Sequence, residues 1–493
     1  MAESNGSKRI KTEDDVDEDR ISSLPDNLIS NILSFLPINN AIATSILSRG
    51  WKPLWTQVTR FPYDVKSSTE FSTIIRHIFP KLALPNIHIL RLSLPLTWEW
   101  NEDDMKICSS TLKFIMSQIC SHNVQQIEVT RNHEDTPHFV LPSCVFETLS
   151  LVVLKLDSKI YCQFAENGIV NLPNLIKLSA YIPDDPEYLY NLLKNCPNLQ
   201  DLSLEYHSDY YVAPVYTKKF YLAAPNLRTL AINVCSDWSY YNFIIDVPNL
   251  RHLSIRGRLV DYQIVKNPTQ LYDACICVLG YVIGREEKEH LVNESWSWKL
   301  FQGLANTKSL QLKDCTMEIL NYVGHAGIGE VLPIFNNLTH HKMSFSWFVA
   351  WKELTQCISC FPNLEVLVLS LKQYKGYSLQ FKNLDDETCN ASNFRYMELW
   401  KRYFKGYDED IVALKHILEM GIALEQLVVC VSGNEKEDRP WKEYQSCERL
   451  FKFPRSSLNC EIVFNGYYIT ASSKGLKNGS IGCQLRCVNS SID

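Results

Sequence analysis

Few residues of this chain have the types and spacing that catalysis or metal binding requires. Cys357 and Cys360 have the spacing of half a zinc site, but no second pair of ligands accompanies them. His340 and His341 are expected to be a surface or strand pair, not metal ligands. The glycine-rich segment 324–329 lacks the lysine and the glycine order of a phosphate-binding loop. The sequence therefore predicts no catalytic residues, no metal site and no cofactor.

Size and composition favour a multidomain globular protein. The chain has 493 residues, of which 46% are hydrophobic and 21% charged, and its net charge of −6 shows no basic excess. No apolar run has the length of a membrane helix, and the N-terminus is polar and charged, unlike an export signal. The 17 cysteines are therefore expected to be reduced. We expect neither nucleic acid nor membrane as partners, and a location in the nucleus, the cytoplasm or both.

Three short helical patterns lie between residues 19 and 60, separated by turn-forming residues. Their apolar positions are Leu28, Ile29, Ile32, Leu33 and Leu36, then Ile42, Ile46 and Leu47, then Trp51, Leu54, Trp55 and Val58. A unit of about forty residues has a core too small to hide this many apolar side chains. Part of its surface is therefore predicted to bind a partner.

The same stretch resembles an F-box of the kind found in plant F-box proteins with leucine-rich repeats. It carries D-R-I-S-x-L-P-D from Asp19, I-L-S-F-L-P from Ile32 and L-S-x-x-W-x-x-L-W from Leu47. The resemblance implies packing against a Skp-type adaptor and, through it, a cullin in a ubiquitin ligase. The implied adaptor-binding surface or its support comprises Leu24, Pro25, Leu28, Ile32, Leu33, Leu36, Pro37, Leu47, Trp51 and Trp55. The alternative is that these residues form only an internal core.

Two departures from the family pattern are expected to weaken adaptor binding. Gly50 stands where a basic residue is usual, which removes a charge contact and, inside a helix, would cost about 1 kcal/mol relative to alanine. Asn39 and Asn40 stand where charged residues are common.

A repeated P-N-L-x-x-L-x-L unit follows a linker at 61–84 that contains one helical segment. Its clear copies begin at Pro173, Pro197, Pro225, Pro248 and Pro362, and degenerate copies begin near Ile87, Val124, Leu151, Leu271, Thr307 and Leu338. From the copy at Pro173 to the copy at Pro248, the intervals between the first leucines of successive copies fall in or near the period of leucine-rich repeats. About eleven units are expected over residues 85–389, each needing its neighbours to bury an apolar face.

The unit predicts an α/β fold, in which an irregular solenoid follows the small helical F-box. The last two leucines alternate and point to one side of a short strand, and the proline is expected at the strand's first position. Stacked strands would form a parallel sheet on the concave side. Its outward middle column would be small and uncharged: Ser179, Ser203, Ala231, Ser254 and Val368. Such a wall suits either an approaching partner or the curvature itself.

The termini differ in character. Residues 390–465 carry F-R-Y-M-E-L from Phe394, L-E-Q-L-V-V from Leu424 and C-E-I-V-F from Cys460. They resemble the FBD domain that ends many plant F-box/leucine-rich-repeat proteins, and they are predicted to cap the repeat array. Residues 1–18 are predicted to be a disordered charged tail, and residues 466–493, rich in Gly, Ser and Asn, a flexible tail.

Aromatic residues cluster after two adjacent repeats. They are Tyr210 and Tyr211 after one repeat and Trp238, Tyr240 and Tyr241 after the next. Tyrosine and tryptophan are frequent at binding hot spots, so these residues form a possible substrate rim. The alternative is that they cover the repeat core.

The repeats predict only the solenoid, and the F-box resemblance implies a non-catalytic subunit of a ubiquitin ligase. Its F-box would bind the adaptor, and its repeats would hold a protein substrate. The alternatives are a leucine-rich-repeat scaffold with a weak or non-functional F-box, and a small-molecule sensor.

Overall fold

A computed structural model of the whole chain describes its parts to different extents. The described residues are 21, 23–94, 102–131, 139–157, 160–161, 170–181, 185–206, 218–234, 241–257, 261–266, 268–278, 296–314, 316, 332–345, 357–371, 394–401, 414–415, 417–419, 421–431, 440–475 and 483–485. The chain divides into two compact units, Met1–Leu151 and Val152–Asp493. The predicted charged tail at 1–18 lies outside the described residues.

The first unit begins with short helices that prolines delimit. They are α1 (Asp26–Leu33), α2 (Ile38–Ala43) and the 3-10 turns η1 (Thr44–Ile46) and η2 (Leu54–Gln57). Pro25 and Pro37 directly precede α1 and α2, where a missing N–H costs nothing. The third predicted pattern forms only the 3-10 turn η2, directly after Pro53.

The rest of this unit starts a parallel sheet. Its elements are β1 (Arg60–Asp64), α3 (Ser68–Ile78), η3 (Phe79–Lys81), η4 (Leu84–Asn86), β2 (Ile89–Leu94), α4 (Glu102–Cys120), β3 (Gln126–Arg131), β4 (Phe139–Val140) and η5 (Ser143–Glu147). β1 pairs with β2, and β2 with β3, all parallel. Residues 61–84, expected to be a linker, thus contribute a strand as well as the predicted helix. Phe61 is fully buried, which explains why this strand belongs to the core.

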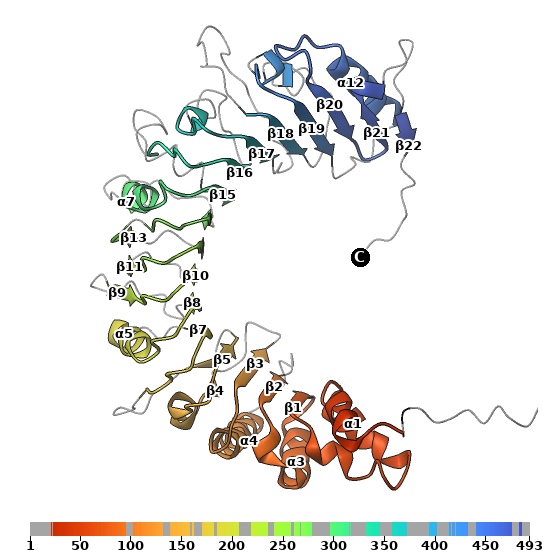
Figure 1. Cartoon of the computed structure of the whole chain (residues 1–493), viewed down its shortest axis with the longest axis vertical. Coiled ribbons are helices and arrows are strands. Elements are labelled where there is room, and N and C mark those ends of the chain that lie inside the picture. The colour runs from red at the N-terminus through yellow and green to blue at the C-terminus, as the bar shows by residue number, and fades with distance from the viewer. Residues whose placement is uncertain are drawn as a thin grey trace, which may run out of the picture. The chain divides into compact units, whose positions relative to one another are not determined.

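The second unit contains the long parallel sheet that the repeats predict (Figure 1). Its strands in order are β5 (Val153–Leu156), β7 (Lys177–Tyr181), β8 (Asp201–Tyr206), β10 (Thr229–Val234), β12 (His252–Gly257), β14 (Asp273–Val278), β15 (Ser309–Asp314), β16 (His340–Phe345), β17 (Val366–Leu371), β18 (Tyr396–Lys401), β19 (Gln426–Val431) and β20 (Glu461–Asn465). Each pairs with the next in parallel. The α/β class and the repeat strands are therefore confirmed.

The proline and asparagine of the repeat lie in a turn ahead of the strand. Pro173, for example, is four residues before Lys177, where β7 begins, so the prediction of proline at the first strand position is wrong. The asparagine of the motif has a direct structural role. Its amide Nδ2 donates to a main-chain carbonyl oxygen of the preceding repeat: Asn198 to Pro173 at 2.7 Å, Asn226 to Pro197 at 2.9 Å, Asn249 to Pro225 at 2.8 Å and Asn363 to Asn336 at 2.8 Å. We call these bonds the asparagine ladder.

A second, smaller sheet forms on the return segments of the central repeats. It consists of β9 (Lys218–Ala223), β11 (Tyr241–Asp246) and β13 (Asp261–Ile264), all parallel. Helix α5 (Pro186–Lys194) contacts β9, and helix α7 (Trp296–Gly303) contacts β13 (Figure 1). A short strand, β6 (Ile160–Tyr161), pairs with β7. Phe220, Phe243 and Tyr262 stack in sequence on the buried face, with ring centroids 5.1 and 5.5 Å apart.

The C-terminal part ends the parallel array with antiparallel strands. Helix α12 (Pro440–Phe451) precedes β20, and β21 (Ile469–Ser472), η6 (Ser473–Gly475) and β22 (Cys483–Leu485) follow it. β20 pairs antiparallel with β21, and β21 with β22. The prediction of a flexible tail from 466 is therefore wrong for these strands. Ile469 and Ala471 are buried, so packing stabilises β21 although its sequence lacks a strong strand pattern.

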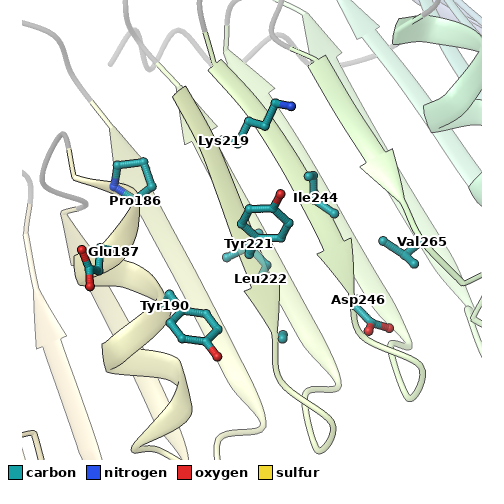
Figure 2. Close-up of a pocket in the computed structure, with 10 residues that line it drawn as sticks. Pro186, Glu187, Tyr190, Lys219, Tyr221, Leu222, Ile244, Asp246 and Val265 are labelled. Carbon is teal, nitrogen blue, oxygen red and sulfur yellow. The ribbon is translucent and has the colours of Figure 1, made fainter. Parts of the chain in front are cut away.

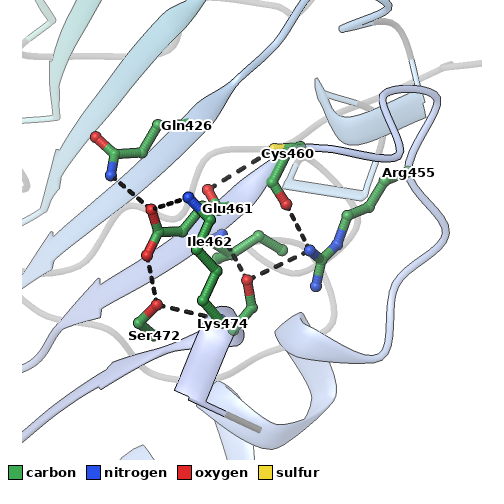
Figure 3. Close-up of polar contacts among 8 residues, drawn as sticks. Gln426, Arg455, Cys460, Glu461, Ile462, Ser472 and Lys474 are labelled. Carbon is green, nitrogen blue, oxygen red and sulfur yellow. Dashed lines mark hydrogen bonds and ion pairs between the residues drawn. The ribbon is translucent and has the colours of Figure 1, made fainter.

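A polar network holds this end together (Figure 3). The Glu461 carboxylate accepts hydrogen bonds from Ser472 at 2.6 Å and Gln426 at 3.1 Å, and pairs with Lys474 at 3.0 Å. These donors, Ser472 first, lower the pKa of Glu461. The Arg455 guanidinium donates to the carbonyl oxygen of Cys460 at 2.6 Å. The network thus ties β19, β20 and the segments after β21 to one another.

Candidate functional site

An exposed apolar surface lies on the N-terminal helices. Leu28 and Ile32 of α1 are about half exposed, and Leu47, after η1, is 68% exposed. Pro25 and Pro37 are also exposed. Leu24 and Leu36 are partly exposed. These predicted adaptor-binding residues are thus available to a partner, which is unusual for apolar side chains grouped so closely in sequence.

Three other predicted residues support this surface from beneath. Leu33, Trp51 and Trp55 are buried. Two serines connect α1 to the following segments. Ser30 Oγ, within α1, donates to the Leu54 carbonyl oxygen at 3.2 Å, and Oγ of Ser34, directly after α1, accepts from the Thr59 amide at 2.9 Å. The buried residues fix the helices, and the exposed ones remain on the surface.

The sequence prediction missed exposed members of the same surface. Phe35 is 65% exposed and Ile46 is 85% exposed. The Arg60 guanidinium carbon lies 4.4 Å from the centroid of the Phe35 ring, a cation–π contact that orients it. Leu28, Ile32 and Phe35 are spaced by four and three residues, the spacing of a helix stripe, which could have revealed Phe35. We call Leu28, Ile32, Phe35, Ile46 and Leu47 the apolar face.

Gly50 lies in a turn and not inside a helix. The expected cost of glycine in a helix interior therefore does not apply. A Cβ atom at this position would meet only Ser48 Oγ, at 3.7 Å. At this position, only the lost charge contact remains as a reason for weaker adaptor binding.

The outward face of the main sheet is the second candidate surface. Strand register places the predicted middle column side by side, from Ser179 to Ser203, Ala231 and Ser254. The flanking column carries polar pairs on neighbouring strands: Lys177 lies 3.9 Å from Asp201, and His252 forms a hydrogen bond with Asp273.

The predicted aromatic rim is only partly visible. Tyr210, Tyr211, Trp238 and Tyr240 lie outside the described residues. Tyr241 is buried, and its hydroxyl forms a hydrogen bond with that of Tyr206, which is also buried. For Tyr241 the structure therefore favours the alternative, a residue of the repeat core.

A pocket of about 600 Å³ lies on the outer face of the smaller sheet (Figure 2). Its lining comprises Pro186, Glu187 and Tyr190 of α5, Lys219, Tyr221, Leu222 and Ala223 of β9, Ile244 and Asp246 of β11, and Val265. Tyr190 and Tyr221 are about half exposed. The sequence patterns did not reveal this pocket, because its walls come from three return segments that only the fold brings together.

Buried titratable residues elsewhere are core residues. His341 is fully buried, and burial lowers its pKa to about 4. Burial also raises the pKa values of Cys357 and Cys360. Within the described ranges, no three His, Cys, Asp or Glu side chains are placed to hold a metal ion, and no helix is long and apolar enough to cross a membrane.

Comparison with known proteins agrees with the N-terminal geometry. The F-box domain model matches residues 21–63, which include the whole apolar face. An F-box/FBD/LRR-repeat protein of Arabidopsis thaliana is 27% identical over 469 residues, covering 90% of this chain and 96% of the relative. A second F-box/FBD/LRR-repeat protein of the same plant is 28% identical over 375 residues, covering 74% and 76%. F-box/LRR-repeat protein 13, also of Arabidopsis thaliana, is 24% identical and covers 92% and 98%.

Proposed function

Because this chain belongs to the plant F-box/FBD/LRR-repeat family, we propose that it is the substrate-recognition subunit of a Skp-cullin-F-box ubiquitin ligase. The F-box would bind the Skp-type adaptor, and the adaptor would connect it to the cullin. The repeats would hold the protein to be modified. The chain itself would carry out no chemistry, since other subunits transfer ubiquitin.

The observation that supports this proposal best is that the apolar face is exposed while Trp51 and Trp55 of the same F-box are buried. Leu47 and Ile46 could have been covered by the unit's own core, as Trp51 and Trp55 are, but they remain exposed. Burying an apolar surface against a partner stabilises the complex by about 25 cal/mol per Å² before the costs of association. The adaptor is the partner that an F-box implies.

The test is copurification with a Skp-type adaptor. The decisive variant is Leu28→Asp/Ile32→Asp, which places charges in the apolar face without removing a core residue. Leu149→Asp is a matched control, because Leu149 is 56% exposed in the same unit but lies outside the matched F-box. We expect the intact chain and the control to retain the adaptor and the double variant to lose it.

Two outcomes would contradict the proposal. One is a folded intact chain that does not bind the adaptor, which would favour the scaffold with a non-functional F-box. The other is equal adaptor binding by the double variant, which would mean that the apolar face is not the interface. Thermal unfolding of the intact chain, the double variant and Leu149→Asp checks that each protein is folded.

A further inference from the structure

The lining of the pocket on the smaller sheet has three charged residues, Glu187, Lys219 and Asp246, and its other members are apolar or aromatic. Lys219 pairs in register with Asn242, and Asp246 follows Asn242 by four residues on β11. At the rise of a strand this places the Cα atoms of Lys219 and Asp246 about 13 Å apart along the strand direction. Figure 2 shows Lys219 toward one end of the strands and Asp246 toward the other.

Between Lys219 and Asp246 most of the lining residues are apolar or aromatic. The rings of Tyr190 and Tyr221 stand on the same side of the sheet (Figure 2). Ala223 is the strand neighbour of Asp246, and its single methyl group leaves the space beside the carboxylate open. Ile244 and Val265 complete an apolar floor.

Asp246 is incompletely satisfied by the chain itself. Its Oδ1 atom is buried and accepts no hydrogen bond, and the Lys266 ammonium lies 3.8 Å from it. Lys266 is 70% exposed, and an exposed ion pair of this length contributes little. The side chain as a whole is 41% exposed although Oδ1 is buried, so a partner's cation would meet the other carboxylate oxygen, Oδ2.

We propose that this pocket binds an arginine side chain of a protein partner. The guanidinium would donate to Asp246 and stack on the tyrosine rings, and the methylene stem would lie over Ala223 and Ile244. Arginine suits the site better than lysine because its planar group stacks on aromatic rings while its N–H groups donate to the exposed oxygen of the carboxylate. Lys219, at the opposite end, would donate to a carbonyl oxygen of the partner's main chain.

The inference rests on the proposed function, because it names the substrate feature that the repeats would read. A basic segment of the protein to be modified would dock on the smaller sheet, on the other side of the repeats from the outward face of the main sheet.

The test is peptide binding to the full-length chain, followed by fluorescence polarisation. The probe is a labelled Gly-Gly-Arg-Gly-Gly peptide with blocked ends. Its controls carry citrulline, which has the same shape without the charge, or lysine at the central position. We expect the arginine peptide to bind at least about tenfold more tightly than the citrulline peptide, because a charged hydrogen-bond pair is lost.

Two variants remove the site in different ways. Asp246→Asn removes the charge, and Ala223→Leu fills the open space from an exposed position. Both substitutions are expected to weaken binding of the arginine peptide about tenfold. Lys266→Ala is the matched control, since it breaks the same ion pair from the other side and leaves the carboxylate free. It is expected to bind as well as the intact chain or better.

Several results would overturn the inference. They are equal binding of arginine and citrulline peptides, no binding of either, or unchanged binding by Asp246→Asn. Free arginine that binds as tightly as the peptide would also overturn it, since the site would then take a small molecule. Adaptor copurification, measured on the same variants, is a separate readout: its loss from the intact chain would contradict the proposed function and not the pocket.

Discussion

Asn226 donates a hydrogen bond from its side-chain amide to the main-chain carbonyl oxygen of Pro197, 2.9 Å away in the preceding repeat. Asn198 and Asn249 make the same bond one repeat earlier and one repeat later. The asparagine of the P-N-L motif therefore joins successive turns, while the leucine that follows it fills the core between them.

The asparagine ladder predicts the effect of substituting one of its members. Asn226→Ala is expected to lower the free energy of unfolding by about 1 kcal/mol, the net value of one hydrogen bond. Asn226→Asp is expected to cost as much, because a carboxylate has the same shape but cannot donate. Urea denaturation measures both. Retained stability in the aspartate variant would show that the lost hydrogen bond does not cause the destabilisation of the alanine variant.

The position of Gly50 in a turn predicts that a basic residue is tolerated there. Gly50→Arg is expected to change the free energy of unfolding by less than about 0.5 kcal/mol, as surface substitutions usually do. It is expected to strengthen adaptor binding by restoring the charge contact that the F-box resemblance implies. Gly50→Ala is the control for stability without charge. Titration of each variant with the adaptor measures the effect, and weaker binding by the arginine variant would contradict the prediction.

Glu443 of α12 organises the turn between β20 and β21. Its carboxylate accepts hydrogen bonds from the main-chain amides of Tyr467 at 2.8 Å and Tyr468 at 2.9 Å. A third bond comes from Ile469 at 3.2 Å. Glu443→Gln replaces one acceptor oxygen with a donor, so we expect a loss of about 1–3 kcal/mol in unfolding free energy.

A second variant, at the neighbouring glycine, tests the same turn. A Cβ atom at Gly466 would lie 2.5 Å from Glu443 Oε2, so Gly466→Ala is expected to disturb the same bonds. Hydrogen exchange of the amides of residues 467–469 measures both variants. Unchanged protection in Glu443→Gln would show that the carboxylate does not hold the turn.

His341 predicts a pH dependence of stability. It occupies an inward position beside Leu310 and Leu367, and its Nδ1 forms a hydrogen bond with the Leu310 carbonyl oxygen at 2.9 Å. Burial lowers its pKa to about 4, below the value of about 6.5 for an unfolded histidine. Between these pH values the unfolded chain binds more protons, so stability falls as the pH drops from about 6.5 to 4.

Replacement by leucine removes this dependence. The loss expected from His341 is at most about 3 kcal/mol at pH 4. His341→Leu is expected to be less sensitive to acid over this range, with His340→Leu, an exposed neighbour, as the control. Thermal unfolding at several pH values compares them. An equal acid dependence in the intact chain and in His341→Leu would contradict the assignment.

Cys144 is predicted to react as a thiolate near neutral pH. A hydrogen bond from the Cys120 side chain and nearby main-chain amides lower its pKa to about 7. Alkylation by iodoacetamide, followed by mass spectrometry, is expected to rise with a midpoint near pH 7. Cys196 is the control, because burial raises its pKa to about 12. A midpoint at the ordinary thiol value of about 8.5 would contradict the prediction.

The sequence by itself determined the repeat strands and the F-box. Both depend on local patterns: Leu202 and Leu204 alternate along β8 and are buried, and Pro25 and Pro37 delimit α1 and α2. Strand direction and register follow from the same repeated spacing, since equivalent leucines stack in one column. These features could be predicted because each is encoded within a few neighbouring residues.

Only the tertiary structure decided which apolar residues are covered. Trp51 is buried while Leu47, four residues earlier, is exposed, although both belong to the same F-box motif. Tyr241 is inside the second sheet, and the pocket beside Asp246 is assembled from α5, β9 and β11. Exposure depends on partners that are distant in sequence, and local periodicity carries no information about them.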